Sequence, residues 1–452
     1  MPCAGEEDCA AAGLVVLMIT LCGGESIRQL HESVVILCMR RAWRTSCNVL
    51  SQLPSLLRCS CVSRRWRALI AHPDHRRKLP QTLAGFFYDT STRCFVNVSG
   101  TGSPLVDPLL AFLPDRERKG LDLLDGCNGL LLCRCFRFAD QNVFDYLVIN
   151  PATQKWVPVP VSRRWSSKVE TARLGFEPAV SPHFYVFEFQ LDWVGDGNGY
   201  TQDDDDKDGH VLGVEIYSSE NRVWIQKQSS WSVEVTLDNE FKSVFVNGML
   251  YMVATEAVIG AVDVEGKTWR IIDFPRSEDS TFLNTAPGYI DMSQGKLHLV
   301  TVDDITGNKQ AVWVLEDLNS EEWTLKHTVS FTHLVGQQFV LFGFFEYNVV
   351  AVHPDRNMVF FIFDEDKTLI SYDMDSGKVC VIRKLGRDCS ESYCIPYVPL
   401  LSESMADGQH MIFGSASSPH TNLSDVAIKL GKGFIYHQIS WKCLFWEHCV
   451  PR

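Results

Sequence analysis

The pattern of apolar and polar positions changes once along the chain. Between residues 49 and 73, apolar side chains recur every three or four positions, which places them on one face of a helix. Pro54 stands just before the first of two short predicted helices and Pro73 closes the second, as expected at helix boundaries. From Gln81 onward, short apolar runs alternate with polar positions and end in turn residues, as strands do. The pattern predicts a small helical module in front of a long β domain.

The β part repeats one theme. Each copy holds an apolar strand, a second strand that ends in a polar turn, and a third strand that opens with an aromatic residue, whose place Val379 takes in the fifth copy. These opening residues are Trp156, Trp224, Trp269, Trp323 and Val379, which lie 45 to 68 positions apart. A four-stranded unit of roughly 40–50 residues is typical of a β-propeller blade. The repeat therefore predicts five blades.

Two further stretches predict a sixth blade. A hairpin at 83–98 precedes the first copy, and strands in 393–446 follow the last one. If these segments pair, both ends of the domain close the ring, and closure leaves only short exposed strand edges. The predicted fold class is mainly β: a small N-terminal helical module followed by a β-propeller with six blades.

Charge changes this picture in one respect. The net charge of −13 is unevenly spread, because residues 1–80 hold eleven Arg and Lys against six Asp and Glu, which leaves +5 there and −18 on the rest. An acidic β domain argues against nucleic acid as its ligand. The basic helical module fits an acidic protein surface or simply solvent, and both interpretations remain open.

The sixteen cysteines are scattered, and no two C-x-x-C motifs are paired, so we expect no zinc cluster. Cys133, Cys135 and Cys380 lie in apolar strand-like runs and are expected to be buried thiols in a reducing compartment. The apolar run Leu14–Cys22 follows acidic residues and is too short to span a bilayer. Neither a signal peptide nor a membrane segment is therefore predicted.

The residues of the helical stretch are more specific than its period. Leu56-Leu57-Arg58-Cys59-x-Cys61-Val62-Ser63-x-x-Trp66-Arg67-x-Leu69-Ile70-x-x-Pro73, preceded by Leu50-Ser51-x-Leu53-Pro54, closely resembles the second half of a plant F-box. In that family a three-helix motif docks on the Skp-type adaptor of a cullin–RING ubiquitin ligase. The resemblance implies that the following residues contact the adaptor: Val49, Leu50, Leu53, Pro54, Leu56, Leu57, Arg58, Val62, Trp66, Leu69 and Ile70.

The start of this module departs from the family pattern. An F-box usually opens with Leu-Pro and two acidic residues, whereas positions 40–47 here read Arg-Arg-Ala-Trp-Arg-Thr-Ser-Cys. Upstream, Ser26 can cap a helix that carries Ile27 and Leu30 on its apolar face. A propeller that binds proteins, but whose F-box no longer docks, therefore stays open as an alternative.

The β domain carries a second resemblance. Cys127-Asn128-Gly129-Leu130-Leu131-Leu132-Cys133, followed by Val148-Ile149-Asn150-Pro151-Ala152-Thr153-x-x-Trp156, looks like the F-box-associated β domain of plant F-box proteins. That domain follows the F-box and is taken to bind the substrate to be ubiquitinated. The resemblance implies a substrate-recognition subunit of an SCF-type E3 ligase. Its partners would be a Skp-type adaptor, through it a cullin–RING ligase, and an unknown protein substrate, in the cytoplasm and/or nucleus.

The expected organisation has three parts. Residues 1–25 form a poorly structured N-terminus, residues 26–79 an F-box-like helical module, and residues 80–452 the F-box-associated propeller. The propeller carries an acidic loop insertion at 195–209, which accounts for the longest spacing between blades.

The acidic insertion invites a metal hypothesis. Asp204, Asp206, Asp208 and Glu215 match the calcium-loop pattern D-x-D-x-D-G-x5-E. That loop needs a helix on each side, and both flanks here alternate with the period of strands. A solvated acidic loop is the favoured interpretation, and calcium is the weaker alternative.

No catalytic motif is present. The chain has no G-x-S-x-G, H-E-x-x-H, P-loop or G-x-G-x-x-G pattern. We therefore expect a protein that is not an enzyme and that needs no cofactor. A propeller enzyme that processes glycans is a less favoured alternative, and it would need carboxylates that converge at the central channel.

Overall fold

The computed structural model describes residues 83–114, 120–137, 140–160, 171–192, 210–237, 242–275, 288–302, 309–336, 347–389 and 394–400. All of them belong to the first of two units, Met1–Asp407, and the second unit, Gly408–Arg452, lies outside the described residues. The predicted helical module at 26–79 also lies outside them.

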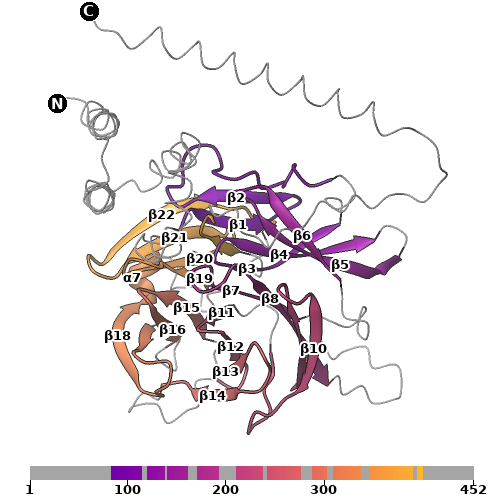
Figure 1. Ribbon diagram of the computed structural model, residues 1–452. Coiled ribbons are helices and arrows are strands. Elements are labelled where there is room, and N and C mark those ends of the chain that lie inside the picture. Colours follow the sequence, from indigo (N-terminus) through magenta and orange to yellow (C-terminus); the bar gives the residue numbers. More distant parts are fainter. Residues whose placement is uncertain are drawn as a thin grey trace, which may run out of the picture. The chain divides into compact units, whose positions relative to one another are not determined.

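The described chain forms six antiparallel sheets, which we number as blades (Figure 1). Blade 1 holds β3 (Leu121–Cys127), β4 (Leu130–Arg137), β5 (Asp140–Asn150) and β6 (Lys155–Val159). Blade 2 holds β7 (Ala172–Phe176), β8 (Phe184–Asp192), β9 (His210–Ser218) and β10 (Val223–Gln228). Blade 3 holds β11 (Ser243–Val246), β12 (Met249–Ala254), β13 (Val258–Asp263) and β14 (Trp269–Asp273).

The other blades follow the same order, with one exception. Blade 4 holds β15 (Tyr289–Ser293), β16 (Lys296–Val302), β17 (Lys309–Leu315) and β18 (Trp323–Ser330), and the short helix α7 (Phe331–Val335) follows. Blade 5 holds β19 (Tyr347–Val352), β20 (Met358–Phe363), β21 (Thr368–Asp373) and β22 (Lys378–Lys384). Blade 6 has three strands from two ends of the domain: β1 (Gly85–Asp89), β2 (Arg93–Asn97) and β23 (Ile395–Tyr397).

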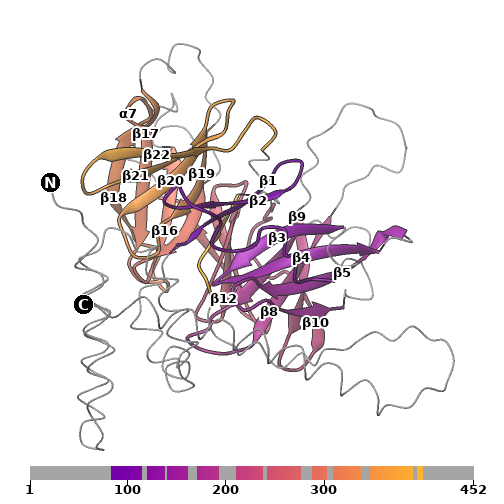
Figure 2. The same ribbon diagram turned by 90° about the horizontal axis from the view of Figure 1, so that it is seen from above.

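The blades form a closed ring. The first strands of successive blades are neighbours, from β3 to β7, β11, β15, β19 and β23, and β23 is again next to β3. Figure 1 shows β3, β7, β11, β15 and β19 inside the ring and β10, β14 and β18 at its rim, and Figure 2 shows the same ribbon turned by 90°. The prediction of a mainly β chain with a six-bladed propeller is confirmed.

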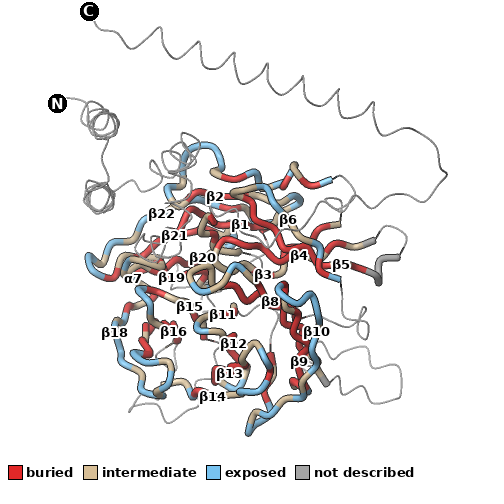
Figure 3. Tube along the Cα trace, in the orientation of Figure 1, coloured by how far each residue is buried: buried red, intermediate tan, exposed pale blue. Residues whose placement is uncertain are grey.

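Apolar burial between neighbouring blades explains why the sheets stack. Between blades 1 and 2, Tyr146 and Val148 of β5 belong to the same buried cluster as Leu174 of β7 and Val186 of β8. A single sheet cannot bury both of its faces, whereas a stacked sheet shares each face with a neighbour. Figure 3 shows the result: burial on the inner strands and exposure on outer strands such as β10, β18 and β22.

The repeated tryptophans open the outer strands, as the repeat predicts. Trp224 is the second residue of β10, and its indole N–H donates to the carbonyl of Pro160, just after the outer strand of blade 1, at 2.8 Å. Trp323 opens β18 and donates to the carbonyl of Asp273, at the end of the outer strand of blade 3, at 2.9 Å. These indoles therefore link the rims of successive blades.

The structure contains two strands that the sequence does not predict, and it exposes one cysteine that was expected to be buried. The repeat predicts no strand at β3 or β7, because β3 is interrupted by Asp122, Asp125 and Gly126, and β7 is only five residues long. Cys380 is exposed on the outer strand β22, so the expectation of a buried thiol is wrong there. Outer strands face solvent on their free side, which the apolar sequence around Cys380 does not reveal.

Ring closure depends on β23. Its residues pair with β1 in antiparallel register, with Tyr397 opposite Gly85 and Ile395 opposite Phe87. The amide N–H of Ala84 extends this pairing by donating to the carbonyl of Tyr397 at 2.9 Å. The predicted sixth blade, which combines the 83–98 hairpin with strands in 393–446, is confirmed through β23, and residues 401–446 lie outside the described residues.

Blade 1 holds the segment that follows β23. The buried Asn150 side chain donates through Nδ2 to the carbonyl of Leu400 at 3.0 Å. Gly129 has a φ of +90°, and a Cβ atom there would lie 2.5 Å from Leu400 Cβ and 2.6 Å from the Val398 carbonyl oxygen. Asn150 and Gly129 are part of the two motifs behind the resemblance to F-box-associated domains, so these motif residues act in ring closure.

We predict that Gly129→Ala destabilises the propeller more than Gly248→Ala does. Both glycines have positive φ in a turn between the first two strands of a blade, and a Cβ at Gly248 meets no atom within 4 Å. The strain of a left-handed backbone costs roughly 1–2 kcal/mol in both variants. The overlap with the closing segment should add about 1–3 kcal/mol in Gly129→Ala alone. Urea unfolding of the two variants measures the difference, and equal losses would contradict this role of Gly129.

Candidate functional site

The predicted adaptor-binding residues, from Val49 to Ile70, lie outside the described residues. Their contacts with a Skp-type adaptor stay a prediction.

The acidic insertion is flanked by strands, as the pattern predicts. β8 ends at Asp192 and β9 begins at His210, so the helices of a calcium-binding helix–loop–helix are absent from both described flanks. Glu215 lies within β9 with 5% of its surface exposed, and its Oε1 accepts from Nε2 of Gln190 at 3.4 Å. Asp204, Asp206 and Asp208 lie outside the described residues, so calcium binding stays untested.

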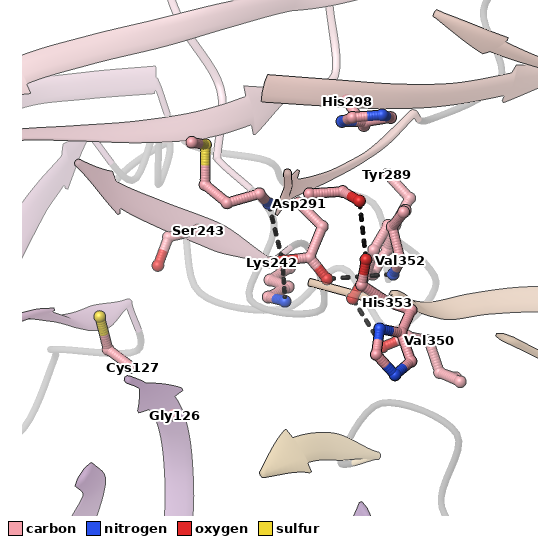
Figure 4. A network of polar contacts seen from close by, with 12 residues as sticks. Gly126, Cys127, Lys242, Ser243, Tyr289, Asp291, His298, Val350, Val352 and His353 are labelled. Atoms are coloured by element: carbon pink, nitrogen blue, oxygen red, sulfur yellow. Dashed lines mark hydrogen bonds and ion pairs between the residues drawn. The ribbon is translucent and has the colours of Figure 1, made fainter. Parts of the chain in front are cut away.

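Polar side chains on the first strands form a cluster that the sequence analysis did not predict (Figure 4). We call it the axial cluster: Asp125, Lys242, Ser243, Tyr289 and Asp291. Asp125 on β3 is buried, and its Oδ2 accepts from the amide N–H of Leu174 at 2.8 Å and from the Ser243 hydroxyl at 3.2 Å. One carboxylate of blade 1 thus binds both blade 2 and blade 3.

Asp291 makes the matching contacts on β15. Its Oδ2 accepts from the amide N–H of Val352 in blade 5 at 3.1 Å, and its Oδ1 lies 2.7 Å from Nζ of Lys242. The side chains of Lys242 and Asp291 are only 17% and 14% exposed. Figure 4 shows Lys242 directed at Asp291, with Ser243 on the other side toward Cys127. Ser243 binds Asp125 and the adjacent Lys242 binds Asp291, so this pair of neighbours connects the contacts of the two aspartates. Together these contacts involve five blades.

Two neighbouring groups stay protonated at neutral pH. Burial raises the pKa of the Tyr289 hydroxyl well above its usual value, and this hydroxyl donates to the carbonyl of Val350 at 2.6 Å. Burial also raises the pKa of the Cys127 thiol to about 12. The cysteine is therefore a thiol, and a thiol is a far weaker nucleophile than a thiolate.

The chemistry of the axial cluster is that of a link between blades. Each carboxylate accepts an amide N–H of the next blade together with the N–H of the residue that follows it, Gly126 or Met292. Such saturated oxygens suit the burial of charge, which requires hydrogen-bond partners. The glycan-processing alternative requires carboxylates free to meet a ligand at the axis, and the engaged oxygens of Asp125 and Asp291 do not supply them.

The position of these two aspartates relative to the next turn is the same in both blades and could have singled them out. Asp125 and Asp291 each stand three positions before a residue with positive φ, Asn128 or Gln294, that opens the turn between the first two strands. An acidic residue at that place interrupts an otherwise apolar inner strand. The partners Leu174, Ser243 and Val352 lie 49 to 118 residues away, and no local pattern points to them.

Within the described ranges, no three His, Cys, Asp or Glu side chains come together as a metal site. The same ranges hold no helix that is long and apolar enough to cross a membrane.

Two buried histidines lie beside the axial cluster (Figure 4). Burial lowers the pKa values of His298 and His353 to about 4. His353 accepts the amide N–H of Asp355 through Nδ1 at 3.1 Å, and its backbone carbonyl accepts the Ser293 hydroxyl at 2.7 Å. Both rings are therefore neutral parts of the packing at physiological pH.

We predict that Asp291→Ala destabilises the propeller by about 2–4 kcal/mol, because it leaves Lys242 largely buried without its counter-ion. The amide N–H of Val352 loses its acceptor as well. The matched control is Glu265→Ala, which removes the partner of the well-exposed Lys267. Chemical denaturation should show no measurable loss for this control. Equal unfolding midpoints of the two variants would contradict a structural role for Asp291.

Acidification should destabilise the propeller through the two histidines. Their pKa values are about 4 in the folded state and about 6.5 in an unfolded chain, so the unfolded chain binds more protons between these values. The free energy of unfolding therefore keeps its full value above pH 6.5. It falls as the pH drops toward 4, by on the order of 2–3 kcal/mol for each ring. His353→Asn keeps an acceptor for Asp355 and removes one titrating ring. Urea unfolding measures the free energy of unfolding of the parent and of His353→Asn at several pH values. If it falls equally in both proteins between pH 7.5 and 4.5, the expectation is wrong.

Comparisons with known proteins give two family matches. The family model "F-box domain" matches residues 46–78, and the family model "F-box protein At3g26010-like, beta-propeller" matches residues 109–419. None of the curated proteins compared with the chain matches it.

Solved structures add little to these matches. A chain of the crystal structure of the mitotic checkpoint complex shares 12% identity, with a TM-score of 0.30 over 61% of this chain and 65% of that one. A structural genomics protein of unknown function from Bacteroides thetaiotaomicron shares 13% identity, with a TM-score of 0.30 over 58% and 56%. This chain thus spans less than two thirds of each, and likenesses at this TM-score support no conclusion.

The family matches agree with the architecture. The propeller match covers more than half of the chain and includes the first strand of blade 1 through β23, while the F-box match stands in front of it. The chain therefore belongs to the At3g26010-like family of F-box proteins with a β-propeller domain.

Proposed function

We propose that this protein is the substrate-recognition subunit of an SCF-type cullin–RING E3 ubiquitin ligase. The observation that carries the proposal is the order of the two family matches, an F-box at 46–78 followed by a propeller at 109–419. The F-box would bind a Skp-type adaptor, and the propeller would bind the protein to be ubiquitinated. Its place of action would be the cytoplasm and/or nucleus.

The proposed adaptor contacts are the apolar residues and Arg58 named from the sequence. All of them, from Val49 to Ile70, fall within the residues matched to the F-box domain. The protein would perform no bond chemistry. Its contribution is proximity, because a target held on the same assembly as the ligase meets it at a high effective concentration.

The two ends of the propeller differ in the length of the loops that they carry, and this difference favours one end for target binding. In a four-stranded antiparallel blade, the connection to the next blade leaves at the end opposite to the turn between its first two strands. Those turns are short, as at 128–129, 247–248 and 294–295, whereas the connections span 160–171, 274–288 and 331–346. Long connections on a rigid scaffold are where binding residues concentrate. We therefore place the target on the end of the ring that carries these connections.

A propeller with an F-box that does not dock is the second candidate. The observation that favours it is the arginine-rich sequence at 40–47, where an F-box usually has Leu-Pro and two acidic residues.

A pull-down with a Skp-type adaptor tests the proposal. We predict that the full-length protein binds the adaptor and that Trp66→Ala weakens binding, since truncating a large aromatic side chain that becomes buried costs ~3–5 kcal/mol. Trp43→Ala is the matched control, because Trp43 lies just outside the residues matched to the F-box. This control should bind as the parent does.

Absence of binding by the parent protein, beside an intact F-box protein that binds, would refute the adaptor role and favour the second candidate. Equal losses in both tryptophan variants would refute the assignment of the contact to Trp66.

A further inference from the structure

The outer strand of blade 5 has an edge that no other described strand covers. β22 ends its sheet and pairs only with β21 within the described residues. The carbonyl of Ile382 is covered, because a Cβ atom at Gly100 would lie 2.3 Å from its oxygen. The main chain from Lys378 to Val381 meets no further described strand, and such an edge can pair with an extended segment of another protein.

The register with β21 shows which side chains of β22 share a face. Side chains alternate along a strand, and the register shifts at Ile382, so Arg383 returns to the face that carries Lys378. One face of β22 carries Lys378, Cys380 and Arg383, and the other carries Val379, Val381 and Lys384. The Val381 side chain is 66% exposed. The strand therefore presents a cationic face and a largely apolar face.

The cationic charge distinguishes β22 from the other outer strands. Each of the strands β2, β6, β10, β14 and β18 contains a single Lys or Arg. β22 contains Lys378, Arg383 and Lys384, and it contains no Asp or Glu. It is thus a basic strip on a domain whose residues 81–452 carry a net charge of −18.

Two of these three cations have no counter-ion in the part of the chain that the structure describes. Lys384 is paired with Asp366 at 2.9 Å. Lys378 and Arg383 are exposed, and neither makes a side-chain hydrogen bond or ion pair within the described residues. Asp373 lies opposite Lys378 on β21, but its Oδ1 accepts two amide N–H groups of the next turn, at 3.0 and 2.9 Å. The charges of Lys378 and Arg383 are therefore available to a ligand.

We propose that β22 binds an extended acidic segment of a partner protein, which adds a strand to blade 5. Acidic residues at alternate positions of this segment face Lys378 and Arg383, and the apolar residues between them face Val379 and Val381. A second copy of this chain does not fit, because it would set one cationic face against another. The inference goes beyond the proposed ligase function and does not depend on it, because the site lies wholly within the propeller.

Binding of a fluorescent peptide of five Glu-Val repeats to the full-length protein tests the proposal. Fluorescence anisotropy gives the dissociation constant. One reference peptide has five Lys-Val repeats, and a second has five Glu followed by five Val. We expect the alternating acidic peptide to bind roughly tenfold more tightly than either reference. Equal affinities, or no binding of the acidic peptide, would overturn the proposal.

N-methylation tests the main-chain pairing. A Glu-Val peptide that is methylated at every amide nitrogen keeps its side chains and loses the N–H donors that an added strand requires. This peptide should not bind. Unchanged affinity after methylation would overturn strand addition.

Charge reversal locates the site. The double variant Lys378→Glu/Arg383→Glu should bind the acidic peptide roughly tenfold more weakly and the Lys-Val peptide more tightly. The matched control Lys267→Glu/Lys309→Glu changes the net charge equally at two exposed lysines of other blades and should bind as the parent does. Melting temperatures show whether the variants are folded. Equal losses in the two folded variants would overturn the assignment to β22, and the comparison of peptides on the parent protein stands even if a variant does not fold.

Discussion

The structure depends on the pairing of β23 with β1. Without it, blades 1 to 5 would form an open stack that exposes one apolar face at each end, and the 83–98 hairpin would have no inner strand. Within the described residues, β23 pairs with β1 through three residues, which lie about 300 positions along the chain from β1. The entropy cost of closing so long a loop grows only slowly with its length, so a few well-placed contacts are enough. Asn150 of blade 1 donates one such hydrogen bond to the carbonyl of Leu400, and Gly129 leaves room for the segment that follows β23.

The axial cluster fixes the positions of the blades relative to one another. Apolar faces attract without strong directionality, so they hold neighbouring blades together but do not fix their positions around the ring. A carboxylate that accepts a specific amide N–H of the next blade does fix them. Asp125 and Asp291 provide such bonds, and the adjacent residues Lys242 and Ser243 couple them. Buried ion pairs are often neutral for stability, and this arrangement is consistent with a role in register instead.

The sequence predicts the repeat because the tryptophans that open the outer strands recur in it, but it hides two of the inner strands, β3 and β7. β3 carries aspartates that accept bonds from distant segments, so its pattern does not look like that of a buried strand. The axial cluster depends on residues up to 118 positions apart, which periodicity cannot relate. Ring closure was predictable because it needs only a hairpin at one end and a spare strand at the other. The predicted adaptor-binding residues lie outside the described residues, so for them the sequence remains the only guide.

The use of the motif residues limits what the family resemblance says about the target. Gly129 and Asn150 belong to the motifs that suggested an F-box-associated domain, and in the structure both serve closure of the ring. The carboxylates on the first strands serve the contacts between blades. A motif that builds the scaffold is needed whichever protein the scaffold binds, so it identifies the family without identifying the substrate. Selectivity must then come from parts that do not hold the ring together, which are the connections between blades and the exposed residues of the rim. A ring fixed from within lets those parts vary without loss of the fold, and that property suits the proposed role of holding a target in one place.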